Sequence, residues 1–187
     1  MTALRTGLLD GRAIALAGGP APAVARWLTD LGARVHEVDL ALGEDGVKDG
    51  AADVGPLHAL VYDSGPAFAG GGQLRLQVAL EQAWIATRGV ATGALIPAGA
   101  GKVVLIAPRP AGGSFAAAAR AALENLARTL SVEWARYAVT TVALAPGDRT
   151  TDEELTELVS FLVSPAGEYF SGCLLELGAS DSLLRTS

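Results

Sequence analysis

Residues 118–147 read AARAALENLARTLSVEWARYAVTTVALAPG, and this stretch decides the fold. Apolar side chains recur at spacings of three and four as far as Tyr137, which predicts an amphipathic helix that Ser114 can cap. Val139–Ala145 is an apolar run closed by Pro146-Gly147, which predicts a buried strand. A long helix that leads directly into a buried strand is one step of an alternating α/β chain.

The same alternation extends over the rest of the chain. A helix is predicted from the spacing of apolar residues between Gly18-Gly19 and Gly32, a second over about Leu74–Leu95, and a third from a Thr151 cap to near Ser164-Pro165. Residues 40–56 are rich in Gly and Asp and are interpreted as a loop. The predicted strands are Arg12–Ala17, Arg34–Val38, Leu57–Tyr62, Lys102–Ala107, Val139–Ala145 and Cys173–Leu177. This order predicts one domain over residues 1–187, with a mostly parallel sheet covered on both faces.

Composition excludes several classes of function. The net charge is −6 and the 14 basic residues are not clustered, so we expect no nucleic-acid partner. The single cysteine, Cys173, cannot form an internal disulfide and fits a reducing compartment. The first residues do not form a signal peptide and no apolar run is long enough for a bilayer, which predicts a soluble cytoplasmic protein without membrane partners. His36 and His58 lie in predicted strands without ligand-spaced partners, so we expect no metal.

The segment Phe115–Leu126, FAAAARAALENL, closely resembles the active-site helix of the short-chain dehydrogenase/reductase family. Further resemblances follow in order along the chain: LLDGRAIALAGG, LHALVYDSG, KVVLIA and TDEELTELVSFLVSPAGEYFSGCLLELG. The resemblance implies a Rossmann-like, doubly wound parallel sheet in three α/β/α layers. Only 17 residues separate Asp39 from Leu57. A helix, a strand and a second helix do not fit there, so we expect about six strands, with the family's third strand and its flanking helix missing.

The resemblance also shows which chemistry is missing. The family's catalytic tyrosine and lysine correspond to Ala116 and Arg120, and Ala107 stands where the catalytic serine is expected. Alanine cannot transfer a proton, and arginine cannot act as an acid or base near neutral pH. Tyr62, at the end of a central strand, is the alternative candidate for a relocated acid.

The cofactor-binding positions are degraded in the same way. Gly18 and Gly19 are residual candidates for the phosphate loop, but prolines follow them and remove amide donors. Asp39 is placed to bind a ribose, and Asp63 replaces the family's asparagine with a carboxylate that would repel a pyrophosphate. The alternative for each is an ordinary turn residue. We expect no cofactor, with NAD(P) as the alternative. Only Asp148–Thr150 remain where the family has its substrate lid.

These observations predict a non-catalytic subunit rather than an enzyme. The partner is either a second copy, in a homodimer or tetramer, or a full-length active relative in a hetero-oligomer. The predicted interface lies on the helices after Gly72 and Ser114, at Ala83, Ala86, Val90, Ala119, Leu123, Leu126, Leu130 and Trp134. One alternative is that these faces pack only on the chain's own sheet. Two other functions stay open: a divergent NAD(P)-dependent oxidoreductase with Tyr62 and Arg120 as its relocated residues, and a nucleotide-sensing module.

Overall fold

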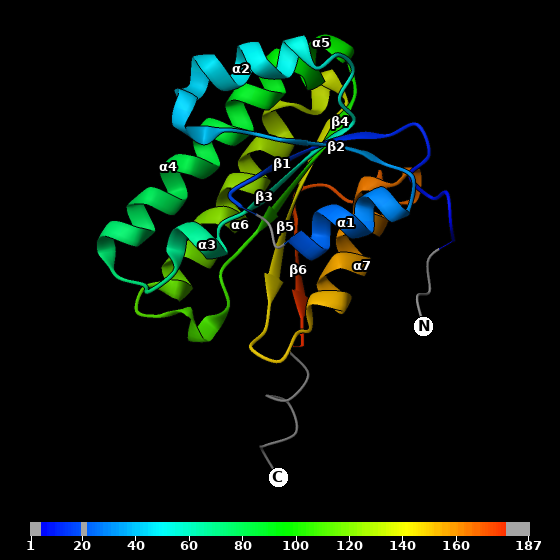
Figure 1. Ribbon diagram of the computed structural model, residues 1–187. Coiled ribbons are helices and arrows are strands. Elements are labelled where there is room, and N and C mark those ends of the chain that lie inside the picture. Colours follow the sequence, from blue (N-terminus) through cyan, green and yellow to red (C-terminus); the bar gives the residue numbers. More distant parts are fainter. Residues whose placement is uncertain (1–4, 20–21, 179–187) are drawn as a thin grey trace.

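Six parallel strands form one sheet in the order β2-β1-β3-β4-β5-β6 (Figure 1). The computed structural model describes residues 5–19 and 22–178. The predicted strands are all present, with bounds shifted by one or two residues. No strand lies between β2 and β3, so the six-stranded Rossmann-like fold is confirmed. The strands are β1 Ala13–Ala17, β2 Arg34–Glu37, β3 Ala59–Asp63, β4 Gly101–Ile106, β5 Val139–Pro146 and β6 Cys173–Leu177.

Helices cover both faces of the sheet, which gives three layers (Figure 1). One face carries α2 Gly43–Asp53, α4 Gln73–Val90 and α6 Ala116–Glu133, and the other carries α1 Pro22–Asp30 and α7 Asp152–Val163. The short helix α3, Gly65–Phe68, follows β3. A π-helical segment, Ala91–Leu95, continues α4 into α5, Ile96–Ala98. The long helix predicted over Leu74–Leu95 is therefore present, with a wider last turn.

Residues 40–56 are not the loop that their composition predicted. Leu40–Leu42 form a 3₁₀ turn and α2 follows. The glycines lower the intrinsic helix propensity, but tertiary packing overrides it because Val47 and Ala51 are buried against the next long helix. A Cβ on Gly89 would lie 2.6 Å from a Val47 methyl group, so glycine on α4 provides the room for this packing.

The start of α6 also differs from the prediction. Ser114 does not cap it; the N-cap is Phe115, which lies in the left-handed region at φ 71° with a half-exposed ring. Just before it, Gly113 and Gly71 pack so closely that a Cβ on Gly71 would lie 2.9 Å from Cα of Gly113. By contrast, Thr151 caps α7 as predicted, with a capping box formed with Glu154.

The residues predicted to form an oligomer interface lie inside the chain. Ala83, Ala86, Val90, Ala119, Leu123, Leu130 and Trp134 are all buried, and Leu126 is partly buried against the same core. The alanine-rich stripes of α4 and α6 pack on the sheet and on each other, which is the alternative left open above. Because a buried side chain offers no area to a partner, seven of the eight predicted interface residues are wrong, and only the partly exposed Leu126 stays a prediction.

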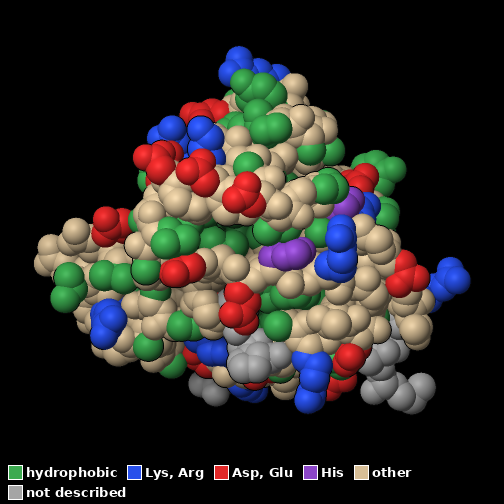
Figure 2. Space-filling model, turned by 45° about the horizontal axis from the view of Figure 1, so that its top comes forward, with side chains coloured by type: hydrophobic (Ala, Val, Ile, Leu, Met, Phe, Trp, Pro, Cys, Tyr) green, Lys and Arg blue, Asp and Glu red, His purple; other side chains and the backbone are tan. Residues whose placement is uncertain are grey.

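Acidic and basic side chains alternate over the surface seen in Figure 2, with small hydrophobic areas between them. Within residues 5–19 and 22–178 no helix is both long and apolar enough to cross a bilayer. The exposed large hydrophobic residues of the long helices are Leu74 and Trp84 on α4 and Val132 on α6, with Phe115 at the start of α6.

Candidate functional site

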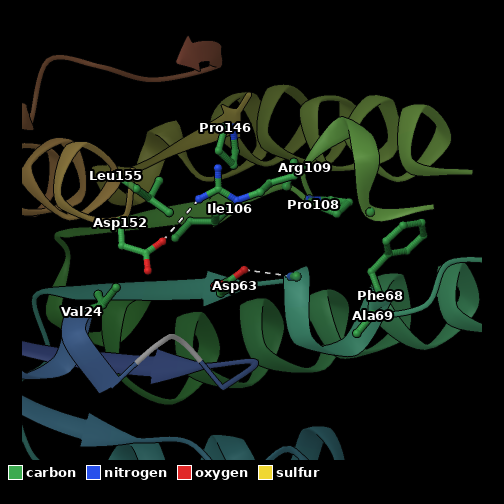
Figure 3. Close-up of a pocket in the computed structure, with 13 residues that line it drawn as sticks. Val24, Asp63, Phe68, Ala69, Ile106, Pro108, Arg109, Pro146, Asp152 and Leu155 are labelled. Carbon is green, nitrogen blue, oxygen red and sulfur yellow. Dashed lines mark hydrogen bonds and ion pairs between the residues drawn. The ribbon is translucent and has the colours of Figure 1, made fainter. Parts of the chain in front are cut away.

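A cavity of about 240 Å³ opens at the carboxyl ends of β3, β4 and β5. Ligands of open α/β sheets bind at this edge. Asp63 reaches the cavity from β3, Arg109 from the loop after β4, and Asp152 from the start of α7 (Figure 3). Apolar contacts come mainly from Val24, Phe68, Ile106, Pro108, Pro146 and Leu155.

The three positions that the resemblance assigns to catalysis carry no group that can transfer a proton near neutral pH. Ala107 lines the cavity, and Ala116 is buried at the first turn of α6. Arg120, one turn further on, donates from Nη1 to the carbonyl oxygens of Pro108 at 3.0 Å and Pro146 at 2.8 Å. The cation at the lysine position therefore ties the loop after β4 to the last residue of β5.

Arg109 ties the same loop after β4 to the loop after β5, and the sequence analysis did not single it out. Its Nη1 donates to the carbonyl oxygens of Gly147 at 2.7 Å and Thr150 at 2.6 Å. Its Nη2 forms an ion pair with Asp152 at 3.4 Å (Figure 3). Asp148 adds a further link by accepting from the Ala111 amide at 2.8 Å. The only sequence signal was an arginine between two prolines, directly after a strand.

Asp63 lies at the bottom of the cavity and keeps a turn in place. Its Oδ1 accepts from the Gly65 amide at 2.8 Å (Figure 3). Burial raises the pKa of Asp63 to about 6, although the Gly65 hydrogen bond and the charge of Arg109 act in the opposite direction. The turn interpretation of this residue is confirmed, and at neutral pH the site holds a partly desolvated negative charge.

Tyr62 does not face the cavity. Its side chain is fully buried in the core under α4 and α6, and its hydroxyl donates to the Ala79 carbonyl at 2.7 Å. Burial and the charge of Asp63 raise the pKa of Tyr62 above its ordinary value. The expectation that Tyr62 could act as a relocated acid is wrong, because successive residues of a strand point to opposite faces and this one points into the core.

The residual cofactor positions have local structural roles. Gly18 adopts φ 83°, and a Cβ there would lie 2.0 Å from the Asp63 carbonyl oxygen, so this glycine is required for close packing on β3. A Cβ on Gly19 would make only an ordinary contact with the Pro66 ring, at 3.9 Å. Asp39 caps the turn before α2 by accepting from the Ala41 amide at 2.9 Å. The prolines predicted to damage this loop are Pro20, which lies outside the described residues, and Pro22, which is the first residue of α1.

At the positions that the resemblance assigns to a nicotinamide dinucleotide, the side chains already have hydrogen-bond partners within the chain. The carboxylate of Asp63 lies where the resemblance places a pyrophosphate contact, Asp39 already has an amide partner, and Arg120 has carbonyl partners. No donor for a substrate carbonyl and no acid is present at Ala107 or Ala116. In the described part of the chain there is also no group of three or more His, Cys, Asp and Glu residues that could hold a metal ion.

Comparison with known proteins places this geometry in context. No protein-family model and no curated protein matches the chain. Among solved structures it is similar to the citronellol catabolism dehydrogenase of Pseudomonas aeruginosa PAO1, with 24% identity, a TM-score of 0.76, and coverage of 94% of this chain and 97% of that one. The chain has the fold of the short-chain dehydrogenases/reductases.

Two further neighbours agree with this assignment of the fold. A putative NAD(P)-dependent gluconate 5-dehydrogenase from Beutenbergia cavernae, solved with bound NADP, matches with 22% identity and a TM-score of 0.72, over 92% of this chain and 97% of that one. A hydroxysteroid dehydrogenase from Escherichia coli matches with 16% identity and a TM-score of 0.70, over 91% and 97%. At these sequence identities the structural similarity establishes the fold only. Any activity has to be inferred from the residues of the site.

Proposed function

We propose that this protein is a non-catalytic member of the short-chain dehydrogenase/reductase family that acts as a subunit of an oligomer. The proposal rests mainly on the hydrogen bonds that Arg120 makes within the chain. A cation that assists a proton donor in an active relative here binds two backbone carbonyls, and the donor position is the buried Ala116. The resemblance places the proton donor of an active relative at the position of Ala116, and an alanine side chain has no proton to give up.

The surface for a partner is the outer face of α4 and α6. On α4, Leu74, Trp84 and Arg88 are exposed, and the Arg88 guanidinium carbon lies 5.4 Å from the Trp84 ring centre. On α6, Ala117 and Ala121 are exposed, one turn apart. Small side chains let a second helix approach closely, and an exposed tryptophan is a typical interface anchor. This outer face replaces the buried residues that the sequence suggested.

The test is the oligomeric state of the purified chain and of point variants. Light scattering after size-exclusion chromatography should give at least a dimer, and Ala121→Glu should convert it to a monomer because a carboxylate would be buried between the helices. Ala52→Glu places the same charge on the exposed face of α2 and should change nothing. A monomeric parent chain that also fails to co-purify with co-expressed full-length dehydrogenases would overturn the proposal.

The two other functions require a bound nucleotide and are tested separately. A relocated oxidoreductase needs an acid in the cleft, and Tyr62 is not available to it. Titration with NADH and NADPH, followed by calorimetry, decides both cases. A dissociation constant of about 1 μM, or −8 kcal/mol, would favour an oxidoreductase if turnover follows and a sensing module if it does not.

A further inference from the structure

A second cavity, of about 500 Å³, lies at the opposite edge of the sheet, where the strands begin. Its volume is in the range of sites for small organic molecules. Three nitrogen-bearing side chains line it: Arg12 before β1, His58 before β3 and Lys102 on β4. Much of the remaining lining is apolar and includes Pro56, Leu57, Ala98, Ala100, Leu162 and Val163.

The His58 ring carries its proton on Nε2, so this atom can donate a hydrogen bond. Its Nδ1 accepts from the Ala13 amide at 3.0 Å, so the ring proton resides on Nε2. Burial, and then the positive charge of Arg12, lower the pKa of His58, which keeps the ring neutral at pH 7. Arg34 acts in the same direction. Two guanidinium groups therefore place the imidazole in a positive field.

Lys102 is only 4% exposed and has one donor left over. Its ammonium group donates to the carbonyl oxygens of Gly167, at 2.7 Å, and Phe170. An ammonium group has three N–H donors, and no third acceptor occurs among the residues that the structure describes. Burial lowers the pKa of Lys102 to about 8, which is the cost of a buried cation without a full anionic partner.

The one acidic residue of this cavity, Glu168, is bound to Arg12. The two side chains meet at 2.9 Å, and the glutamate side chain is 61% exposed while that of Arg12 is 20% exposed. The cavity is thus lined by two cations, a neutral donor and a single carboxylate, and that carboxylate is mostly exposed to solvent. Because exposed ion pairs contribute little to stability, Glu168 can be displaced by another anion at small cost.

We propose that this cavity binds a small organic acid, with its carboxylate on Arg12, His58 and Lys102 and its hydrocarbon part on the apolar lining. Charge-assisted hydrogen bonds to a carboxylate are the stronger class of polar contact, and the apolar walls favour a carbon chain over a free inorganic anion. The site lies at the opposite edge of the sheet from the dehydrogenase cleft. It does not depend on the subunit role proposed above.

The test is calorimetric titration of the whole protein with hexanoate, with 1-hexanol and inorganic phosphate as comparison ligands. Hexanoate should bind more tightly than either. Arg12→Gln should weaken hexanoate binding by about tenfold because a charge-assisted contact is lost. Glu168→Gln should tighten binding because the competing carboxylate is gone. Arg75→Gln, which removes an exposed positive charge at the start of α4, serves as the control and should leave binding unchanged.

The opposite shifts expected for Arg12→Gln and Glu168→Gln separate a binding site from a structural ion pair, since both variants break the same pair. Equal effects of the two variants would overturn the proposal, as would hexanoate binding no better than 1-hexanol. Phosphate binding as tight as hexanoate would overturn the assignment to an organic acid. Circular dichroism of each variant checks that a loss of binding does not reflect unfolding.

Discussion

Replacing Asp63 with asparagine should stabilise the protein at neutral pH. Burial raises the pKa of this carboxyl from 3.8 to about 6. Each pKa unit corresponds to 1.36 kcal/mol, so the folded state loses up to about 3 kcal/mol by holding the charged form at pH 7. Asparagine keeps an oxygen that can accept from the Gly65 amide and carries no charge. The upper limit corresponds to a rise in melting temperature of roughly 6–12 °C for a chain of this size.

The raised pKa of Asp63 determines how the stability gain of Asp63→Asn changes with pH. Between pH 3.8 and 6 the folded state binds the Asp63 proton more tightly than the unfolded state, so the contribution of Asp63 to stability falls as pH rises. The advantage of Asp63→Asn should therefore be full above pH 6 and vanish near pH 4. Urea unfolding at pH 7.5 and pH 4 measures it, with Asp152→Asn as the control at an exposed carboxylate in the same cavity. An advantage that is absent at pH 7.5, or equal at both pH values, would refute the reasoning.

Three other substitutions test the structure at separate points. Arg120→Met removes both ties to the backbone carbonyls and should lower the free energy of unfolding by about 2 kcal/mol in urea titrations, whereas a change below about 0.5 would mean that the ties are solvent-replaceable. Thr151→Ala breaks the capping box of α7 and should cost about 1 kcal/mol by the same assay, with Thr129→Ala as an exposed mid-helix control. Gly93→Ala should cost about 1–3 kcal/mol, because its Cβ would lie 2.3 Å from the Lys48 carbonyl oxygen; a gain in stability would contradict the close contact with α2.

Most strands could be predicted from the sequence because they are short apolar runs bounded by glycine, proline or a charge, and β2, with the sequence RVHE, could be predicted from its alternation. The helix α2 could not, since its stability comes from partners distant in the chain. Val47 and Ala51 are one turn apart, and they face Gly89 and Gly93, also one turn apart. The spacing within each pair becomes informative only once the packing of α2 on α4 is known.

The candidate site was predictable where a residue type excludes a role. Alanine at position 116 excludes proton transfer in any environment. The sequence could not show what Arg120 and Arg109 bind, because carbonyl oxygens are present at every position and only the loop geometry selects them. It also placed Tyr62 at the correct strand end but on the wrong face, because in an all-apolar strand the alternation of side chains leaves no visible pattern.

The hydrogen bonds of Arg109 and Arg120 to backbone carbonyl oxygens have a consequence for the order of the cleft. Loops that close over a ligand in an enzyme cleft are often ordered only when the ligand binds. Here Arg109 and Arg120 fasten the loops after β4 and β5 from inside the polypeptide. We therefore expect these loops to hold their shape without a bound ligand.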